Sequence, residues 1–329
     1  MNLKKYAFLF ITKGLMLLLI FFSLVSTTQA LENKIKGFLQ GQFTNDQSEG
    51  VIENEFFIHR ARLGISGKIH QQITYNLILG AMEPPDRNPH LVNAFVDFNY
   101  YTPYLKIRFG QFLLPFGLEG PQPITLNPMI ERATATKKLN PFRMFRDIGL
   151  QLSGEYKIID YAVAVINGSG ANSPDENNEK DVIGTIGFSP IEGLRIGTSY
   201  HFGRYKKNTK SNLNRRRYGL DVEFVRKGLR LRTEIIDRQD EQADGSEKID
   251  AGWYILAGYK FRFNLEPLIR YEQYYPDAHD IDVNSDVATI GLNYYILENN
   301  RISVNYEFKD DIENPKVGNR LTAQLQVVF

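Results

Sequence analysis

The 329-residue sequence contains no cysteine and only one tryptophan. The lack of cysteine excludes disulfides, thiolate metal sites and a lipid-modified amino-terminal cysteine. After the first thirty residues no segment approaches eighteen consecutive apolar residues, so no helical membrane span is expected there. The formal net charge of +1 favours no particular charged partner. We expect no nucleic-acid partner.

Residues 1–30 have the pattern of a secretory signal peptide. Two early lysines precede an apolar run at 14–25, which is too short to span a bilayer as a helix. Small residues at 28–30 suit a cleavage site. A signal anchor is the alternative, but nothing later has the pattern of a soluble domain. Cleavage removes three lysines and leaves 36 basic and 38 acidic residues in one expected domain, 31–329.

Alternation of apolar and polar residues is the main structural signal. Near the end, one face carries Leu321, Ala323, Leu325, Val327 and Phe329, and the other carries Thr322, Gln324 and Gln326. Strands are predicted near 34–44, 54–69, 72–82, 91–101, 104–114, 146–157, 160–168, 181–189, 193–204, 215–226, 229–238, 250–261, 264–275, 286–297, 300–308 and 319–329. Sixteen strands, with 22 Phe and 18 Tyr, are typical of an antiparallel transmembrane β-barrel of a bacterial outer membrane.

The connections between these strands alternate between short and long. Long polar loops are expected at 45–53, 83–90, 115–145, 169–180, 205–214, 239–249, 276–285 and 309–318. In such barrels the short turns face the periplasm and the long loops face outward, which places both termini in the periplasm. A soluble β-sandwich gives no reason for this alternation.

The polar face of the predicted strands is heavily charged. In the second strand, Arg60 and Arg62 oppose Ala61 and Leu63. An arginine or lysine facing lipid at the bilayer midplane costs about 2–4 kcal/mol, so this face must meet water. A barrel of sixteen strands is wide enough to hold an aqueous channel.

Loop 3, at 115–145, is the longest connection and is rich in apolar residues such as Phe116, Leu139 and Phe142. A loop of this length is usually functional or disordered, and this composition is not that of disorder. We expect loop 3 to fold into the barrel and narrow the pore.

The candidate pore constriction combines cations of loop 3 with cations of the strands. Loop 3 and its exit supply Arg132, Lys137, Lys138, Arg143 and Arg146; the strands supply, among others, Arg60, Arg62 and Arg108. Rings of arginine and lysine select anions, and arginine matches phosphate oxygens in a bidentate manner. The alternative is that the strand arginines pair with the acidic residues that share their faces and stiffen the wall.

A second basic segment extends from 203 to 220 and contains seven cations and no acid. It predicts either an electrostatic funnel for anions or contact with the phosphates of outer-leaflet lipid. The later loops oppose a funnel, because Asp and Glu are frequent at 239–249, 276–285 and 309–318.

Several segments resemble one family of outer-membrane porins. The similar segments are Arg60-Ala61-Arg62-Leu63, Gly110-Gln111-Phe112-Leu113-Leu114-Pro115-Phe116-Gly117-Leu118-Glu119, Glu131-Arg132, Arg146-Asp147-Ile148-Gly149-Leu150 and Val165-Ile166-Asn167-Gly168. Together they resemble the phosphate-selective porin O and P family. The resemblance implies a homotrimer of water-filled pores with a basic constriction. It also implies passage of inorganic anions such as phosphate, which some members favour.

We therefore expect a passive diffusion channel for small hydrophilic solutes, with a preference for anions. The alternatives are a general or sugar-permeable porin of the same fold, and a structural or adhesive barrel plugged by loop 3. Enzymatic activity is not expected, because the five histidines are scattered and Gly168-Ser169-Gly170 lacks the flanking pattern of a nucleophile elbow. The sequence thus predicts no catalytic residues, no metal site and no cofactor.

Overall fold

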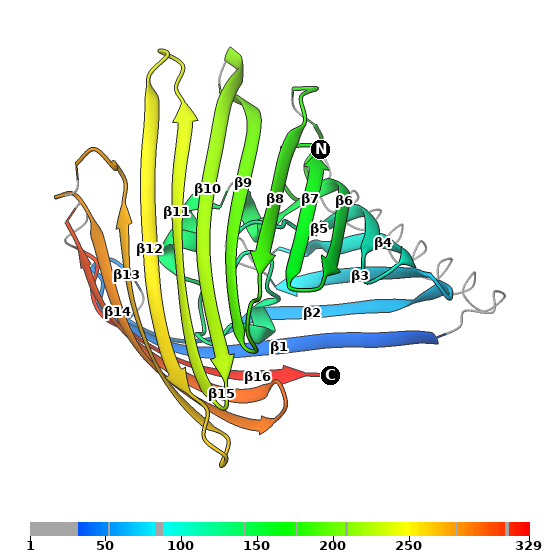
Figure 1. The fold of residues 1–329 in the computed structure, drawn as a ribbon. Coiled ribbons are helices and arrows are strands. Elements are labelled where there is room, and N and C mark those ends of the chain that lie inside the picture. Colours follow the sequence, from blue (N-terminus) through cyan, green and yellow to red (C-terminus); the bar gives the residue numbers. More distant parts are fainter. Residues whose placement is uncertain are drawn as a thin grey trace, which may run out of the picture.

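The computed structural model describes residues 32–51, 53–82, 88–140, 142–175, 177–207, 210–280, 282–312 and 316–329. The expected signal peptide, 1–30, lies outside the described residues. Among the described residues, sixteen antiparallel strands form a closed barrel in which sequence neighbours pair and β1 pairs with β16. The predicted antiparallel barrel is confirmed. Figure 1 shows β9–β12 side by side, coloured green to yellow.

Each predicted strand is present, and most ends agree within a few residues. The strands are β1 (Glu32–Asp46), β2 (Asn54–His70), β3 (Ile73–Met82), β4 (His90–Tyr101), β5 (Leu105–Leu113), β6 (Arg146–Tyr156), β7 (Ile159–Ile166), β8 (Asp181–Phe188), β9 (Leu194–Lys207), β10 (Lys210–Arg226), β11 (Leu229–Glu241), β12 (Glu247–Tyr259), β13 (Leu265–Tyr275), β14 (Ser285–Leu297), β15 (Asn300–Asp311) and β16 (Arg320–Val328).

The two faces of the strands differ in the way that the alternation predicted. In β13, Glu266, Arg270 and Glu272 are buried, whereas Ile269 and Tyr271 between them are exposed. The exposed apolar face is suited to contact with lipid. The backbone is suited to it as well, because the closed barrel leaves no strand edge with unpaired backbone groups. The charged face is therefore the inner face of the barrel.

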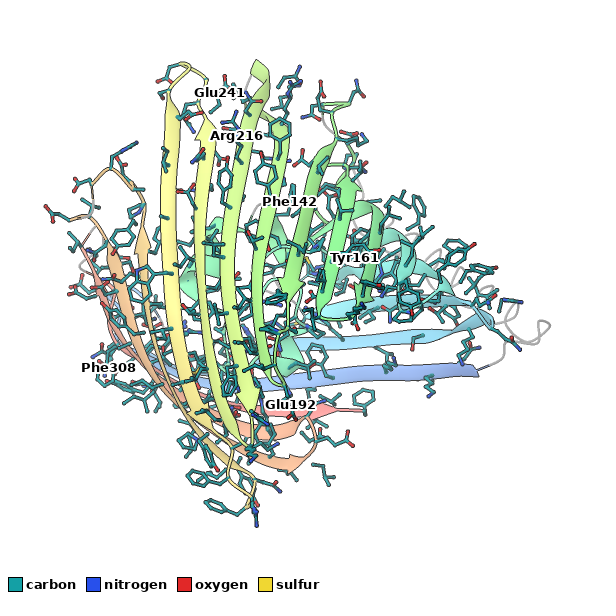
Figure 2. The ribbon with its side chains drawn as sticks, viewed as in Figure 1. Phe142, Tyr161, Glu192, Arg216, Glu241 and Phe308 are labelled. Carbon is teal, nitrogen blue, oxygen red and sulfur yellow. The ribbon has the colours of Figure 1, made fainter. Side chains whose placement is uncertain are left out.

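Two predicted loops, 205–214 and 239–249, are shorter than expected. The β9 and β10 strands approach each other to Lys207 and Lys210, and β11 extends to Glu241. Residues near these ends are polar on both faces, so the alternation that marks a strand in lipid disappears while the backbone pairing continues. Figure 2 shows Arg216 and Glu241 at one end of the barrel and Glu192 at the other.

The described helical elements all belong to loop 3, which connects β5 to β6. They are the 3₁₀ turns η1 (Ile124–Leu126) and η2 (Arg143–Phe145), with the helix α2 (Thr134–Leu139) between them. None of the helices in the described part of the chain has the length and apolar character needed to cross a membrane. In Figure 1 the blue-green ribbon of loop 3 passes behind β9–β12, and α2 contacts β11, β12 and β13.

The barrel closes where β1 meets β16. Gly37 and Phe329 exchange two backbone hydrogen bonds, with N···O distances of 2.8 and 3.0 Å. A Cβ atom at Gly37 would lie 2.6 Å from the Phe329 ring and 2.7 Å from the carbonyl oxygen of Arg62. Both distances are shorter than van der Waals contact, so the seam requires glycine at this position.

We expect Gly37→Val to destabilise the closed barrel by roughly 1–3 kcal/mol, the usual cost of overpacking. The measurement is gel electrophoresis of samples heated to increasing temperatures. It gives the temperature at which the band of the compact barrel is replaced by the band of the unfolded protein. The matched control is Gly41→Val on the same strand, because a Cβ atom at Gly41 meets nothing within 4 Å. Equal conversion temperatures for the two variants would contradict this role of Gly37.

Candidate functional site

Loop 3 packs through an apolar cluster against buried side chains of the strands. The cluster consists of Leu114, Phe116, Ala135, Leu139 and Phe142 with Phe112, Ala164, Ile166, Ile183, Ile236 and Tyr274 of the strands. Burying a large apolar side chain contributes about 1.5–3 kcal/mol. Loop 3 is therefore held in one position by the wall of the barrel.

Polar side chains of the wall bind the backbone of loop 3 along its length. Glu234 of β11 accepts a hydrogen bond from the Leu118 amide at 3.0 Å. The Asn293 side chain of β14 donates to the Pro128 carbonyl at 2.8 Å. Further donors are Arg301 of β15 to Asn127, Gln326 of β16 to Thr125, and Arg270 of β13 to Glu131. Loop 3 thus spans the wall from β11 to β16.

Two carboxylates satisfy the first amide groups of α2. Its own N-cap residue, Ala133, provides no side-chain acceptor. Instead, the Ala133 amide donates to Glu119 at 2.8 Å, and the Thr134 amide donates to Glu272 at 2.9 Å. Anionic groups at a helix N-terminus also interact favourably with the helix dipole. These bonds fix the rotation of α2, which buries Ala135 and Leu139.

The opposite face of α2 carries Lys137 and Lys138, and both side chains are exposed. The Lys138 ammonium lies 4.5 Å from the centre of the Tyr274 ring. Lys137 interacts electrostatically with Glu131 and with Glu307 of β15. Two of the predicted constriction residues are therefore placed together, on a helix whose other face is fixed to the wall.

Two other predicted cations of this region are buried. The Arg132 guanidinium donates to the carbonyl groups of Glu119 and Gln122 at 2.9 and 2.6 Å, and it lies over the Phe145 ring. Arg146 donates to the Asn93 side chain at 2.9 Å. Their burial, with relative exposures of 8% and 5%, gives both residues a role in holding loop 3. Arg143 begins η2, and its side chain lies outside the described part.

The predicted strand cations lie on the inner face of β2 and β5. Arg60 pairs with Glu131 of loop 3 at 3.3 Å. Arg108 makes a bidentate pair with Asp97, at 2.7 and 2.9 Å. Arg62 is partly exposed and lies over the Phe38 ring at 5.2 Å.

Most other inner-face arginines also have acidic partners, on the same strand or on strands one or two positions away. The described pairs include Arg195 with Asp160 and Asp221, Arg217 with Asp240, Arg230 with Glu266, Arg232 with Glu223, Arg270 with Glu272, and Arg320 with Glu307. These arginines thus fit the second interpretation of the sequence, in which they pair with acidic residues and stiffen the wall. Their charge is largely compensated, and they add little field of one sign along the barrel.

The arginines of the basic segment of β9 and β10 are paired in the same way. Arg215 and Arg217, which face inward, pair with Asp181 and Asp240, respectively. Arg216 faces outward and lies 3.8 Å from Glu247. The segment itself contains no acid, and its acidic partners come from other loops and strands.

The tip of loop 3 contacts β2 through Glu131. Burial alone would raise the pKa of the Glu131 carboxyl, but the Arg60 guanidinium and a hydrogen bond with His59 hold that pKa well below its usual range. The His59 Nε2 to Glu131 Oε1 distance is 2.8 Å. A depressed pKa means that the contact stabilises the fold above the ordinary carboxyl pKa of about 4.3. The stabilisation is lost as pH falls through the lowered value.

We therefore expect open-channel current noise to stay constant between pH 7 and about 5 and to rise only below about pH 4. Glu131→Gln removes the charge and is expected to show the added noise already at pH 7. Single-channel recording at each pH provides the measurement. Wild-type noise from Glu131→Gln at pH 7 would show that this contact does not restrain the loop tip.

The anchors of loop 3 were not identified from the sequence. In the sequence, Glu234 and Glu272 resemble the other acids of the charged strand faces, and the apolar Ile183 and Ile236 stand on otherwise polar faces. An apolar residue on an otherwise polar face was the available signal, since such a residue needs a partner inside the barrel. Within the described ranges, no group of three or more acidic or histidine side chains is placed to hold a metal ion.

A closed sixteen-stranded barrel with an apolar outer face, a charged inner face and a long anchored loop between β5 and β6 defines an outer-membrane porin. The model of the family described as "Phosphate-selective porin O and P" matches residues 34–252 and 208–329. The chain belongs to this family of outer-membrane channel proteins.

Solved structures of porins share the fold. The anion-selective porin from Comamonas acidovorans is 11% identical, with a TM-score of 0.69, and the match covers 91% of this chain and 99% of that one. OmpF of Salmonella typhi, in complex with daunomycin, is 14% identical with a TM-score of 0.67, covering 90% and 97%. The trimer form of OmpT from Vibrio cholerae is 10% identical with a TM-score of 0.68, covering 91% and 99%. No curated protein matches the chain significantly.

Proposed function

We propose that the barrel is a passive diffusion channel for small hydrophilic solutes that prefers anions, and that loop 3 occupies the lumen and forms its constriction. One observation carries the anion preference. The wall arginines are paired, whereas Lys137 and Lys138 are exposed on a helix fixed to the wall. The open passage then lies between α2 and the inner face of the strands that loop 3 leaves uncovered.

In this mechanism an anion at the constriction exchanges part of its hydration for the field of the two ammonium groups. Lysine acts as a mobile point charge, which suits a site that must release its ion. Arg62 and the Arg108–Asp97 pair on the opposite wall add polar contacts. Phosphate is the candidate solute that the family name supports, and its charge strengthens the same interaction.

The direct test is single-channel recording in a planar bilayer with a KCl gradient, followed by titration of phosphate. An anion-selective reversal potential, with chloride current blocked by low phosphate, would support a phosphate-binding constriction. A cation-selective reversal potential would reject the anion preference.

A general or sugar-permeable porin is the second candidate, and the compensated wall charges favour it. Liposome swelling separates the two proposals, because a general porin admits neutral sugars as fast as anions of equal size. A plugged structural or adhesive barrel would show near-zero conductance in the same bilayer recording.

We also propose assembly as a homotrimer, exported by means of the segment 1–30. The trimeric state recorded for a porin of the same fold supports the assembly. Crosslinking in intact outer membranes, followed by unheated gel electrophoresis, tests it. Amino-terminal sequencing of the mature protein tests cleavage after Ala30.

We further propose that the exposed apolar face contacts outer-membrane lipid. On the outer surface of β9 and β10, the rings of Tyr200 and Tyr218 lie 5.2 Å apart, with exposed Ile196 and Leu220 on one side of them. Arg216 lies on the other side, toward the loops. Aromatic rings between apolar and charged residues are typical of a membrane interface.

A further inference from the structure

A cavity of about 410 Å³ lies between the connection that follows β7 and the outer ends of β9 and β10. Its lining includes Phe142 of loop 3, Ser169, Tyr205, Lys206 and Arg215. It lies at the end of the barrel that carries the long loops, beside the point where loop 3 returns to the wall. Cavities of about 300–1,000 Å³ are the size of small-molecule sites.

The Arg215 guanidinium is held in a fixed position within this cavity. The residue is 8% exposed, and its Nε donates to Asp181 at 2.9 Å. A second donor group bonds the Gly168 carbonyl. The guanidinium carbon lies 4.6 Å from the centre of the Phe142 ring and 6.0 Å from that of Tyr205. A guanidinium fixed in this way loses little conformational freedom when a ligand binds.

The nearby acids are engaged by other groups. Asp181 also bonds the His201 ring at 2.7 Å and the Arg204 amide at 3.1 Å. Asp147 accepts hydrogen bonds from the amides of Ile148 and Gly168. Lys206 adds a second cation at the cavity, where its side chain is exposed.

The segment Gly168-Ser169-Gly170 forms one side of the cavity. Gly168 has a positive φ of 83°, and a Cβ atom there would lie 2.7 Å from Asp181 and 2.9 Å from the Arg215 guanidinium. Glycine therefore lets the backbone approach the buried pair closely. The same turn brings Ser169, a hydroxyl donor and acceptor, into the lining.

We propose that this cavity binds small hydroxylated organic anions of the sugar phosphate class before they enter the pore. Lys206 matches the charge of the phosphate group, and Arg215, whose charge is compensated by Asp181, also lines the cavity. Ser169 matches a sugar hydroxyl, and the partly exposed Tyr205 ring offers a flat surface to a sugar ring. This inference depends on the proposed function in one respect: the bound anion is expected to pass from the cavity into a conducting channel.

The test is isothermal titration calorimetry of the detergent-solubilised protein with glucose 6-phosphate, glucose and inorganic phosphate as separate probes. We expect glucose 6-phosphate to bind more tightly than either other probe. Lys206→Gln is expected to weaken its binding about tenfold, as for loss of a charged hydrogen bond. Ser169→Ala is expected to weaken it about threefold, as for loss of a neutral one.

Two controls separate this site from the constriction. Lys180→Gln removes an exposed cation that does not line the cavity, and Lys137→Gln/Lys138→Gln removes the constriction charges; both should leave glucose 6-phosphate binding unchanged. Unchanged binding in Lys206→Gln would overturn the proposal, as would equally tight binding of inorganic phosphate and glucose 6-phosphate by the Lys137→Gln/Lys138→Gln variant, which lacks the constriction charges. The reversal potential of the same preparation tests the channel's anion preference independently.

Discussion

Replacing Lys137 and Lys138 by glutamine is expected to lower the anion-to-cation permeability ratio by about tenfold or more. A unit charge about 6 Å from an ion in water-like surroundings changes its energy by roughly 0.7 kcal/mol. Two such charges correspond to roughly 1.4 kcal/mol for the anion, which is a factor of about ten, and the loss of repulsion for the cation changes the ratio in the same direction. The change is measured as a shift of the reversal potential in a KCl gradient. Adding Arg143→Gln is expected to extend the shift in the same direction.

The control is the double variant Lys34→Gln/Lys36→Gln, which removes the same charge from the exposed start of β1. It should leave the reversal potential close to the wild-type value. If the reversal potential of the Lys137→Gln/Lys138→Gln variant is also unchanged, the two lysines do not form the selective site, and the anion preference loses its main support.

Removing the apolar anchors of loop 3 is expected to widen the channel. Phe116 and Leu139 are almost fully buried between loop 3 and the wall. Truncating such side chains to alanine costs about 3–5 kcal/mol for phenylalanine and about 2–5 kcal/mol for leucine. The strand ladder does not depend on either side chain, so Phe116→Ala/Leu139→Ala should still form a barrel. Its loop 3 should detach for part of the time.

The expected result is a severalfold rise in single-channel conductance, with liposome swelling extended to larger neutral sugars. The matched control, Phe109→Ala/Leu150→Ala, makes the same truncations on the exposed outer face of β5 and β6. It should keep the wild-type conductance. If the Phe116→Ala/Leu139→Ala barrel folds and shows wild-type conductance and size limit, loop 3 does not form the narrowest part.

The sequence predicted the barrel well because each strand in a membrane wall carries its own signal. Alternation within β13 or β16 requires no knowledge of the neighbouring strands, since lipid lies on one side and water on the other. Strand ends beyond the membrane were less accurate, as at Lys207 and Glu241. There the surroundings no longer differ between the two faces.

The candidate site was only partly accessible to the same reasoning. Alternation placed Arg108 and Arg60 on the inner face but not beside Asp97 and Glu131, because pairing depends on strand register and on the path of loop 3. Arg132 and Lys137 looked equivalent in sequence. Only the burial of one and the exposure of the other separates them.

The attachment of loop 3 also sets an order for assembly. Its backbone is bound by Glu234, Asn293 and Gln326, which lie on strands that follow loop 3 by roughly one to two hundred positions in the chain. Contacts between such distant positions form late, because the intervening chain must be ordered first. We therefore expect the wall to close first, and the newly inserted barrel to pass through a wide, unselective stage before the proposed constriction forms.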